Sequence, residues 1–188
     1  MGCKRCHLWK LGTQTVFGEG PSTAELMFVG EQPGDVEDRE GEPFVGPAGQ
    51  LLREALAEAG IDVTTVYLTN AVKHFKWKPK GKRRIHDKPN REEVLACRMW
   101  LDEEIEKIKP RAIVALGATA AGTLVGSAAR VTRDRGKPFP ATLADFVTVT
   151  VHPSSILRAP DAEARARERK QLVTDLKRIA ARVRKMAP

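Results

Sequence analysis

The 188-residue chain has no run of the roughly 18 apolar residues that a membrane-spanning helix requires. It has only three cysteines, an odd number, so we expect free or metal-bound thiols rather than a disulfide framework. The first ten residues, MGCKRCHLWK, lack the apolar centre of a secretory signal, and we therefore expect a cytoplasmic protein. Repeats, low-complexity tracts and clear linkers are also missing, which predicts a single domain over residues 1–188.

Positive charge is in excess. Lys and Arg number 32 against 24 Asp and Glu, giving a net charge of +8. The excess is concentrated in KHFKWKPKGKRRIHDKPNR, residues 73–91, where cationic residues far outnumber the single Asp87 and alternate with Phe75 and Trp77. Cations interleaved with aromatic rings suit a phosphate backbone with exposed bases. We interpret this segment as a basic loop that contacts nucleic acid, with a solvated surface as the alternative.

Short apolar runs alternate with helical patterns along the chain. Strands are expected at 25–30, 66–70, 112–117 and 146–151. Helices are expected at 48–59, near 118–125 and at 161–184, and Asn90 with Glu93 resembles a capping box that starts another helix. This alternation predicts an α/β fold, a three-layer sandwich with a mostly parallel four-stranded sheet and helices on both faces.

Polar or Gly/Pro-rich sequences follow three of the four predicted strands. GEQPGD (30–35) follows the first strand, Asn70 ends the second, and HPSS (152–155) follows the last. Each alone is more simply a turn or a structural hydrogen-bonding group. In a parallel sheet, however, the carboxyl ends of the strands share one edge, where ligands bind. Together the three sequences predict a site.

These motifs, in this order, resemble those of the iron–sulfur uracil-DNA glycosylases of family 4. The resemblance rests on GEQPG, PFVGPAG at 43–49, TNAVK at 69–73 and HPSS, and it covers nearly the whole chain. GEQPG together with KRRIH (82–86) resembles one branch, the UdgX-type enzymes. The resemblance implies excision of uracil from DNA and, for that branch, a covalent bond between the enzyme and the DNA through the loop histidine, here His86.

The same resemblance implies a [4Fe–4S] cluster, whose usual ligands are four thiolates. The third family cysteine falls at His74 in this sequence, so the implied ligands are Cys3, Cys6, His74 and Cys97. His7 is the rival fourth ligand. Zinc would accept the same three cysteines and one histidine, whereas CKRCH also matches a c-type haem motif. The implied role of the cluster is structural.

Uracil excision requires an extruded base, stabilisation of the departing uracil anion and a nucleophile at C1′. The amide of Asn70 can accept from N3–H of uracil and donate to O4, a pattern that cytosine does not match. Phe44 is expected to stack on the base, with core packing as the alternative. His152 is expected to donate to uracil O2, and Gly30 and Gln32 to line the same pocket.

Glu31 is expected to orient and polarise the nucleophile, with Asp35 secondary; capping of the following turn is the alternative for both. A neutral imidazole is a competent nucleophile near neutral pH, so His86 could capture the sugar cation before water does. Arg84 would then hold the loop by pairing with a phosphate or a carboxylate. Contacts to the DNA backbone are expected from Lys82, Arg83, Arg84, Ser154, Ser155 and Arg158.

Three hypotheses follow. The first is a single-turnover uracil-DNA glycosylase trapped through His86. The second is a conventional glycosylase in which Glu31 activates water. The third is an iron–sulfur module that binds nucleic acid without catalysis, which would need none of Glu31, Asn70 and His152. We expect a monomer acting on uracil-containing DNA, with a preference for single strands.

Overall fold

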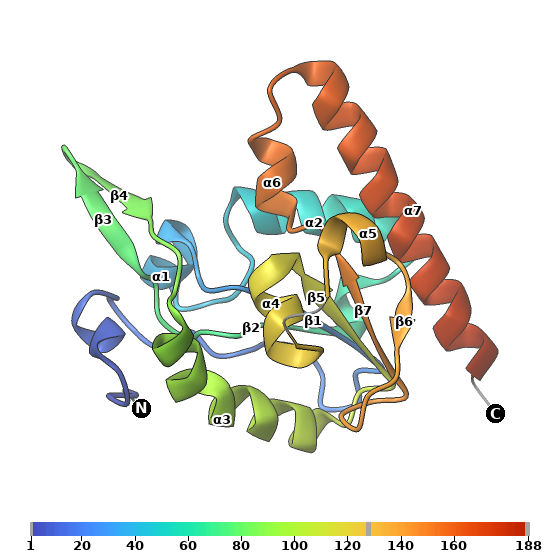
Figure 1. Cartoon of the computed structure of the whole chain (residues 1–188), viewed down its shortest axis with the longest axis horizontal. Coiled ribbons are helices and arrows are strands. Elements are labelled where there is room, and N and C mark those ends of the chain that lie inside the picture. Colours follow the sequence, from blue (N-terminus) through green and yellow to red (C-terminus); the bar gives the residue numbers. More distant parts are fainter. Residues whose placement is uncertain (1, 127–128, 187–188) are drawn as a thin grey trace.

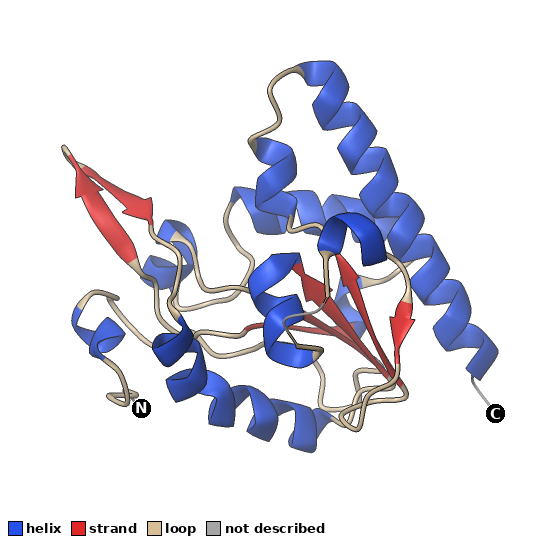
Figure 2. Cartoon of the chain, in the orientation of Figure 1, coloured by secondary structure: helices blue, strands red, loops and turns tan. Residues whose placement is uncertain are grey.

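A five-stranded sheet in the order β2-β1-β5-β7-β6 forms the centre of the computed structural model, which describes residues 2–126 and 129–186 (Figures 1 and 2). The parallel strands are β1 (Leu26–Gly30), β2 (Val66–Asn70), β5 (Ala112–Leu116) and β7 (Phe146–Thr150). They confirm the predicted mostly parallel sheet. The fifth strand, β6 (Pro138–Phe139), pairs antiparallel with β7 and was not predicted, because two residues are too short to show a periodic pattern.

Helices cover both faces of this sheet, as the alternating pattern predicts (Figure 2). The helix that begins after Asn90 has the expected capping box: the Asn90 side chain accepts from the Glu93 N–H, and the Glu93 carboxylate accepts from the Asn90 N–H. The α-helices are α1 (Asp35–Glu40), α2 (Pro47–Glu58), α3 (Arg91–Ile108), α4 (Gly117–Leu124), α5 (Val131–Asp134), α6 (Pro153–Leu157) and α7 (Ala162–Met186), and the 3-10 helices are η1 (His7–Lys10) and η2 (Val63–Thr65).

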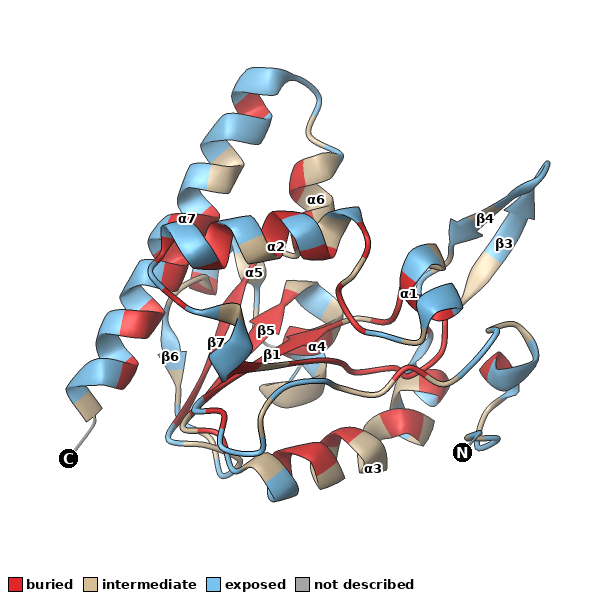
Figure 3. Ribbon diagram, turned by 180° about the vertical axis from the view of Figure 1, so that it is seen from behind, coloured by how far each residue is buried: buried red, intermediate tan, exposed pale blue. Residues whose placement is uncertain are grey.

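Two hydrophobic cores lie on opposite faces of the sheet, because successive strand residues point in opposite directions. Phe28 of β1 packs with α2, α6 and α7, whereas its neighbour Met27 packs with α3 and α4. The strands are therefore buried on both faces, as Figure 3 shows in red. Burial on both faces explains why they appear in the sequence as short continuous apolar runs.

The prediction that residues 73–91 form a loop is wrong for the middle of this segment. Residues 77–86 form an antiparallel hairpin of β3 (Trp77–Lys80) and β4 (Arg83–His86), with Gly81 in a left-handed conformation at the turn. The hairpin extends away from the central sheet, and its outer part is exposed (Figures 1 and 3). Trp77 lies opposite His86 in the register, so His86 sits at the base of the hairpin, near the sheet.

Within residues 2–126 and 129–186, no helix combines the length and apolar character needed to cross a membrane.

Candidate active site

A cavity of about 880 Å³ lies beyond the carboxyl ends of the parallel strands. Its walls come from the turn after β1, the end of β2, the start of α4, the base of the hairpin and the start of α6. The lining includes the predicted site residues Glu31, Gln32, Asp35, Phe44, Asn70, His86, His152, Ser154, Ser155 and Arg158. Motifs that are far apart in the sequence are thus brought together, as the strand-end rule predicts.

One end of this cavity is formed by side chains that surround Gly30, the last residue of β1, which is itself buried and, contrary to the prediction, does not line the cavity. Gly30 lies beside Asn70 in the parallel register. A Cβ added at Gly30 would lie 2.3 Å from Oδ1 of Asn70, 2.9 Å from Cζ of Phe44 and 3.4 Å from Nε2 of His152. The three predicted base-contacting side chains therefore converge on a backbone position that only glycine leaves open.

The position of Phe44 is compatible with either role that the sequence leaves open for it. Its side chain is buried in the core cluster between the sheet and the helices α2, α6 and α7, yet it also lines the cavity. Its ring stacks on that of His152, with the centroids 6.3 Å apart and the planes 27° apart. The backbone of Phe44 is left-handed, with φ of 58°, and Gly49 allows the close approach, because a Cβ there would lie 1.8 Å from the Phe44 carbonyl oxygen.

His152 is held as a neutral donor that faces the cavity. It forms the N-cap of α6, where its Nδ1 accepts the backbone N–H of Ser154 at 3.1 Å and contacts the Ser154 hydroxyl at 2.9 Å. The proton of the neutral ring is then on Nε2, the atom nearest to Gly30. Burial lowers the pKa of His152 to about 4, against the opposing charge of Glu31. At neutral pH His152 donates a hydrogen bond without adding a positive charge.

Glu31 and His86 form a pair at the cavity. Nε2 of His86 lies 3.0 Å from Oε1 of Glu31, while the hydroxyl of Thr119 donates to Oε2. Burial opposes ionisation of Glu31, but hydrogen bonds from His86 and Thr119, with the charges of His86 and Lys88, outweigh it and lower its pKa. Glu31 is therefore a carboxylate at neutral pH. The His86 side chain remains 50% exposed, so an incoming substrate can reach it.

The amide of Gln32 is directed to the base of the hairpin. It donates to the carbonyl oxygens of Lys76 and Asp87 at 3.0 and 3.1 Å and accepts from the Lys76 N–H at 3.2 Å. Asp87 follows His86 directly in the chain. Gln32 thus ties the strand carrying His86 to the turn carrying Glu31.

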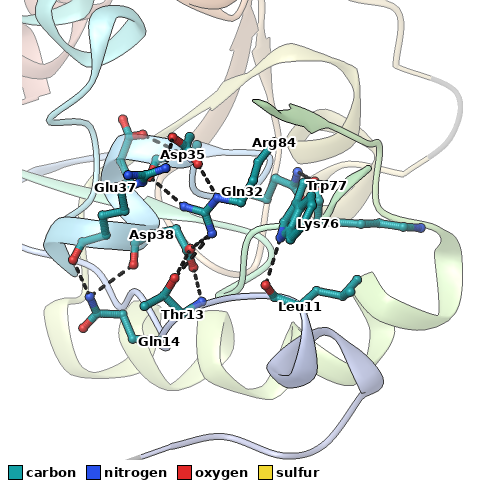
Figure 4. A network of polar contacts seen from close by, with 12 residues as sticks. Leu11, Thr13, Gln14, Gln32, Asp35, Glu37, Asp38, Lys76, Trp77 and Arg84 are labelled. Atoms are coloured by element: carbon teal, nitrogen blue, oxygen red, sulfur yellow. Dashed lines mark hydrogen bonds and ion pairs between the residues drawn. The ribbon is translucent and has the colours of Figure 1, made fainter. Parts of the chain in front are cut away.

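Arg84 pairs with carboxylates, one of the two partners expected for it (Figure 4). Its guanidinium binds Asp35 at 2.5 Å and Asp38 at 2.6 Å, and it also donates to the Thr13 hydroxyl at 3.3 Å. The guanidinium also lies near two aromatic rings. Its carbon is 5.4 Å from the ring centroid of Phe75 and 5.7 Å from that of Trp77. Asp35 and Arg84 are accordingly bound to each other, while Asp35 still lines the cavity.

The aromatic rings of residues 73–91 are not placed to stack on exposed bases, contrary to what their alternation with cations suggests. Phe75 is buried, and Trp77 is half-buried and donates from its ring nitrogen to the Leu11 carbonyl oxygen at 2.8 Å (Figure 4). Lys82 and Arg83 at the hairpin tip and Arg158 after α6 are exposed, as DNA contacts require. The hydroxyls of Ser154 and Ser155 instead contact Nδ1 and the carbonyl oxygen of His152.

The three cysteines lie close together although Cys97 is distant in the sequence. Cys6 and Cys97 contact each other through their side chains, and both interact with Cys3. Burial raises the pKa of Cys97 to about 11, so a bound metal would be needed to keep it a thiolate. Nε2 of His74 shares the Thr15 hydroxyl with the Cys3 N–H, whereas its Nδ1 is buried without a hydrogen-bond partner in the described part of the chain. His7 instead contacts Glu93.

Among the residues that the structure describes, no three His, Cys, Asp or Glu side chains converge tightly enough to hold a single metal ion. A four-iron cluster does not require such convergence, because each ligand binds a different iron atom. Three thiols and an imidazole nitrogen without a partner have the donor chemistry of a cluster site. The donor set therefore fits an iron–sulfur cluster.

Sequence reasoning missed three groups around the site. The buried ammonium of Lys73 binds Thr69, the Asn70 carbonyl oxygen and Glu104. Lys73 lies in the quoted TNAVK motif, but its partner Glu104 is distant in sequence. Glu37 accepts from the N–H groups of Gly34 and Gly46, joining the two glycine-rich turns. Thr119 follows β5, the one predicted strand whose end was not considered, and the strand-end rule would have found it.

Comparison with known proteins agrees with this geometry. A family model described as the uracil DNA glycosylase superfamily matches residues 17–177. The type-4 uracil-DNA glycosylase of Sulfurisphaera tokodaii is 37% identical over 187 residues, covering 95% of this chain and 79% of that protein. The type-4 uracil-DNA glycosylase of Thermotoga maritima is 43% identical over 164 residues, covering 87% and 82%. A type-5 uracil-DNA glycosylase of Pyrobaculum aerophilum is 35% identical over 132 residues, covering 62% and 55%. The chain belongs to the uracil DNA glycosylase superfamily.

Proposed function

We propose that this protein is a uracil-DNA glycosylase that breaks the bond between N1 of uracil and C1′ of deoxyribose in DNA. The observation that carries the proposal is the cavity end at Gly30, where Asn70, Phe44 and His152 converge beside the Glu31–His86 pair. A base-recognition pocket next to a carboxylate and an imidazole supplies what excision of an extruded base requires. A module that only binds nucleic acid needs neither.

Each side chain at this end has a role toward uracil. The Asn70 amide accepts from N3–H and donates to O4, which selects uracil over cytosine. Phe44 supports the ring by stacking. Nε2–H of His152 donates to O2, where negative charge develops as the base departs. A neutral donor suits this task, because His152 keeps its proton position at neutral pH.

We further propose that His86 captures the sugar, as in the UdgX-type branch that the sequence resembles. The C1′–N1 bond breaks with its electron pair moving to uracil, and Nε2 of His86 bonds to C1′ while its proton passes to Glu31. The 3.0 Å contact between Nε2 and Oε1 of Glu31 provides the path for that proton. An imidazole bonded to C1′ has no easy leaving group, so the protein–DNA adduct persists.

The second candidate is conventional turnover, the reaction of the type-4 family. Glu31 would then accept a proton from water as the water oxygen bonds to C1′, and His86 would only assist. Two observations favour it. Glu31 is ionised and lines the cavity. In addition, this chain aligns with 79% and 82% of the length of the two relatives above that are named type-4 enzymes. The two candidates differ only in which nucleophile reaches C1′.

We also propose a [4Fe–4S] cluster held by Cys3, Cys6, Cys97 and Nδ1 of His74. When bound, the cluster would cross-link the N-terminal segment, the start of the basic segment and α3.

Lys82, Arg83 and Arg158 contact the DNA backbone, whereas Arg84 holds the hairpin through Asp35 and Asp38. We propose that the protein acts as a monomer in the cytoplasm on uracil-containing DNA; the burial of Phe75 and the fixed position of Trp77 remove the aromatic contacts that would favour single strands.

A denaturing gel tests these proposals. The protein is mixed with an end-labelled single-stranded oligonucleotide carrying one uracil, and the His86→Ser variant is run beside it. A slow band that survives heat and SDS, absent with His86→Ser, is expected for capture through His86. Free abasic product without a slow band would support turnover by water. Unchanged oligonucleotide in both lanes would contradict glycosylase activity.

Gly30→Ala is expected to slow uracil release by at least about tenfold, because the new methyl group would collide with the Asn70 amide and the Phe44 ring and displace them from the base. The measurement is single-turnover uracil release from the same oligonucleotide. Gly122→Ala in α4 is the matched control, since no atom lies within 4 Å of its added Cβ. That variant is expected to release uracil normally and to gain up to about 1 kcal/mol in stability. Normal release by Gly30→Ala would place the base elsewhere in the cavity.

A further inference from the structure

Thr119 holds the one oxygen of Glu31 that His86 does not contact. Its hydroxyl donates to Oε2, while Nε2 of His86 lies 3.0 Å from Oε1. The carboxylate is therefore bound at both ends, by a neutral donor on α4 and by an imidazole on β4. Two fixed contacts define the direction in which a carboxylate faces, whereas one leaves it free to rotate.

The backbone around Thr119 is itself fixed. Two residues earlier Gly117 has φ of 87°, and a Cβ there would lie 3.1 Å from Cβ of His152. Ala120 and Ala121 are completely buried against the sheet. The Thr119 carbonyl oxygen accepts from the Thr123 hydroxyl at 2.8 Å. The start of α4 thus contacts His152 through Gly117 and Glu31 through Thr119, on a support that packing holds rigid.

We propose that Thr119 is a positioning residue of the reaction: its hydroxyl fixes the Glu31 carboxylate so that Oε1 faces His86. The proposal rests on the proposed function for its consequence in catalysis, but the contact itself exists without substrate. Thr119 does not touch the reacting atoms. It acts through Glu31, by keeping the carboxylate ionised and aimed at the atom that takes or loses the proton.

Removing the Thr119 hydroxyl has a defined effect on the titration of Glu31. The charged or titratable groups that face Glu31 are His86, Lys88 and His152, while α4 contributes the neutral hydroxyl of Thr119. This hydroxyl stabilises the ionised form of Glu31. Without it the carboxyl is a weaker acid, its pKa rises, and a reaction that needs the ionised form loses rate first on the acid side.

The direct test follows the side-chain carboxyl carbon of Glu31 by NMR during a pH titration, with Glu31→Gln used to assign the signal. Thr119→Val removes the hydroxyl and keeps the shape, whereas Thr119→Ser keeps the hydroxyl. The expected result is a titration midpoint at higher pH in Thr119→Val and a midpoint restored in Thr119→Ser. Equal midpoints in the parent and Thr119→Val would overturn the proposal.

The pH profile of uracil release gives the second readout. Thr119→Val is expected to lose some rate at the plateau, where Glu31 is ionised but no longer held toward His86, and to be a further factor of about three to ten slower on the acid limb, the size of one hydrogen bond. A loss by one constant factor at all pH values that Thr119→Ser does not restore would indicate a merely structural role and would also overturn the proposal. If the parent released no uracil while the midpoints moved as expected, the proposed function would fail and the positioning of Glu31 by Thr119 would stand.

Discussion

Glu31→Gln is expected to slow uracil release by roughly 10²- to 10³-fold, the largest effect on activity among the site substitutions. Glutamine keeps the shape of the side chain but removes the negative charge beside the sugar and the acceptor for a proton from His86 or water. Both candidate mechanisms need this carboxylate, so the loss is expected whichever nucleophile reaches C1′. Single-turnover uracil release from the single-stranded oligonucleotide measures it.

Asp35→Asn is the matched control, because Asp35 is a second carboxylate that lines the same cavity. Its partner Arg84 keeps the contact with Asp38 at 2.6 Å when the Asp35 charge is removed. We expect uracil release to fall by less than about tenfold, the loss of one charge-assisted hydrogen bond outside the reacting atoms. Comparable losses in the two variants would contradict a special role for Glu31 and indicate that any negative charge at the cavity suffices.

The parallel sheet and the position of the site could be predicted because both depend on local signals. The strands at Leu26–Gly30 and Val66–Asn70 begin as short apolar runs and are buried along almost their whole length, since both faces are covered. The polar groups that follow them are then placed at one edge by topology alone. Glu31, Asn70 and His152 were found in this way. Their placement at one edge of the sheet needed no knowledge of side-chain contacts.

The hairpin could not be predicted, because its strands lack such a signal. Residues 77–86 contain Pro79, several lysines and only one β-branched apolar residue, Ile85. Contacts outside the hairpin hold it: Arg84 reaches Asp35 and Asp38, and Trp77 donates to Leu11. Thr119 is different: its place after a strand could have been predicted from the strand-end rule, but its contact with Glu31, 88 residues away in sequence, could not.

A buried ion pair also escaped the sequence analysis, and it supports the strand end that carries Asn70. Lys73 is completely buried, and its ammonium donates to Oε2 of Glu104 at 2.7 Å, to the Thr69 hydroxyl at 2.7 Å and to the Asn70 carbonyl oxygen at 2.8 Å. Glu104 also accepts from the Gly18 N–H and the Thr69 hydroxyl. All three protons of the ammonium and both oxygens of the carboxylate are therefore bound.

Glu104→Leu is expected to lower the free energy of unfolding by about 3–5 kcal/mol, because it leaves the Lys73 ammonium buried without a counter-charge. Urea unfolding followed by circular dichroism measures the change. Glu58→Gln is the matched control: Glu58 contacts Arg169 at 2.6 Å in a pair that is largely exposed, so a change of at most about 1 kcal/mol is expected.

The double variant Lys73→Met/Glu104→Leu separates charge from packing. Replacing both partners by apolar side chains removes the uncompensated charge, so the double variant is expected to be more stable than Glu104→Leu alone. It still loses the hydrogen bond to the Asn70 carbonyl oxygen, and uracil release should fall even where the fold is recovered. If the double variant were no more stable than Glu104→Leu, the cost would come from packing around Glu104 and not from a buried charge. If it released uracil normally, the strand end would position Asn70 without help from Lys73.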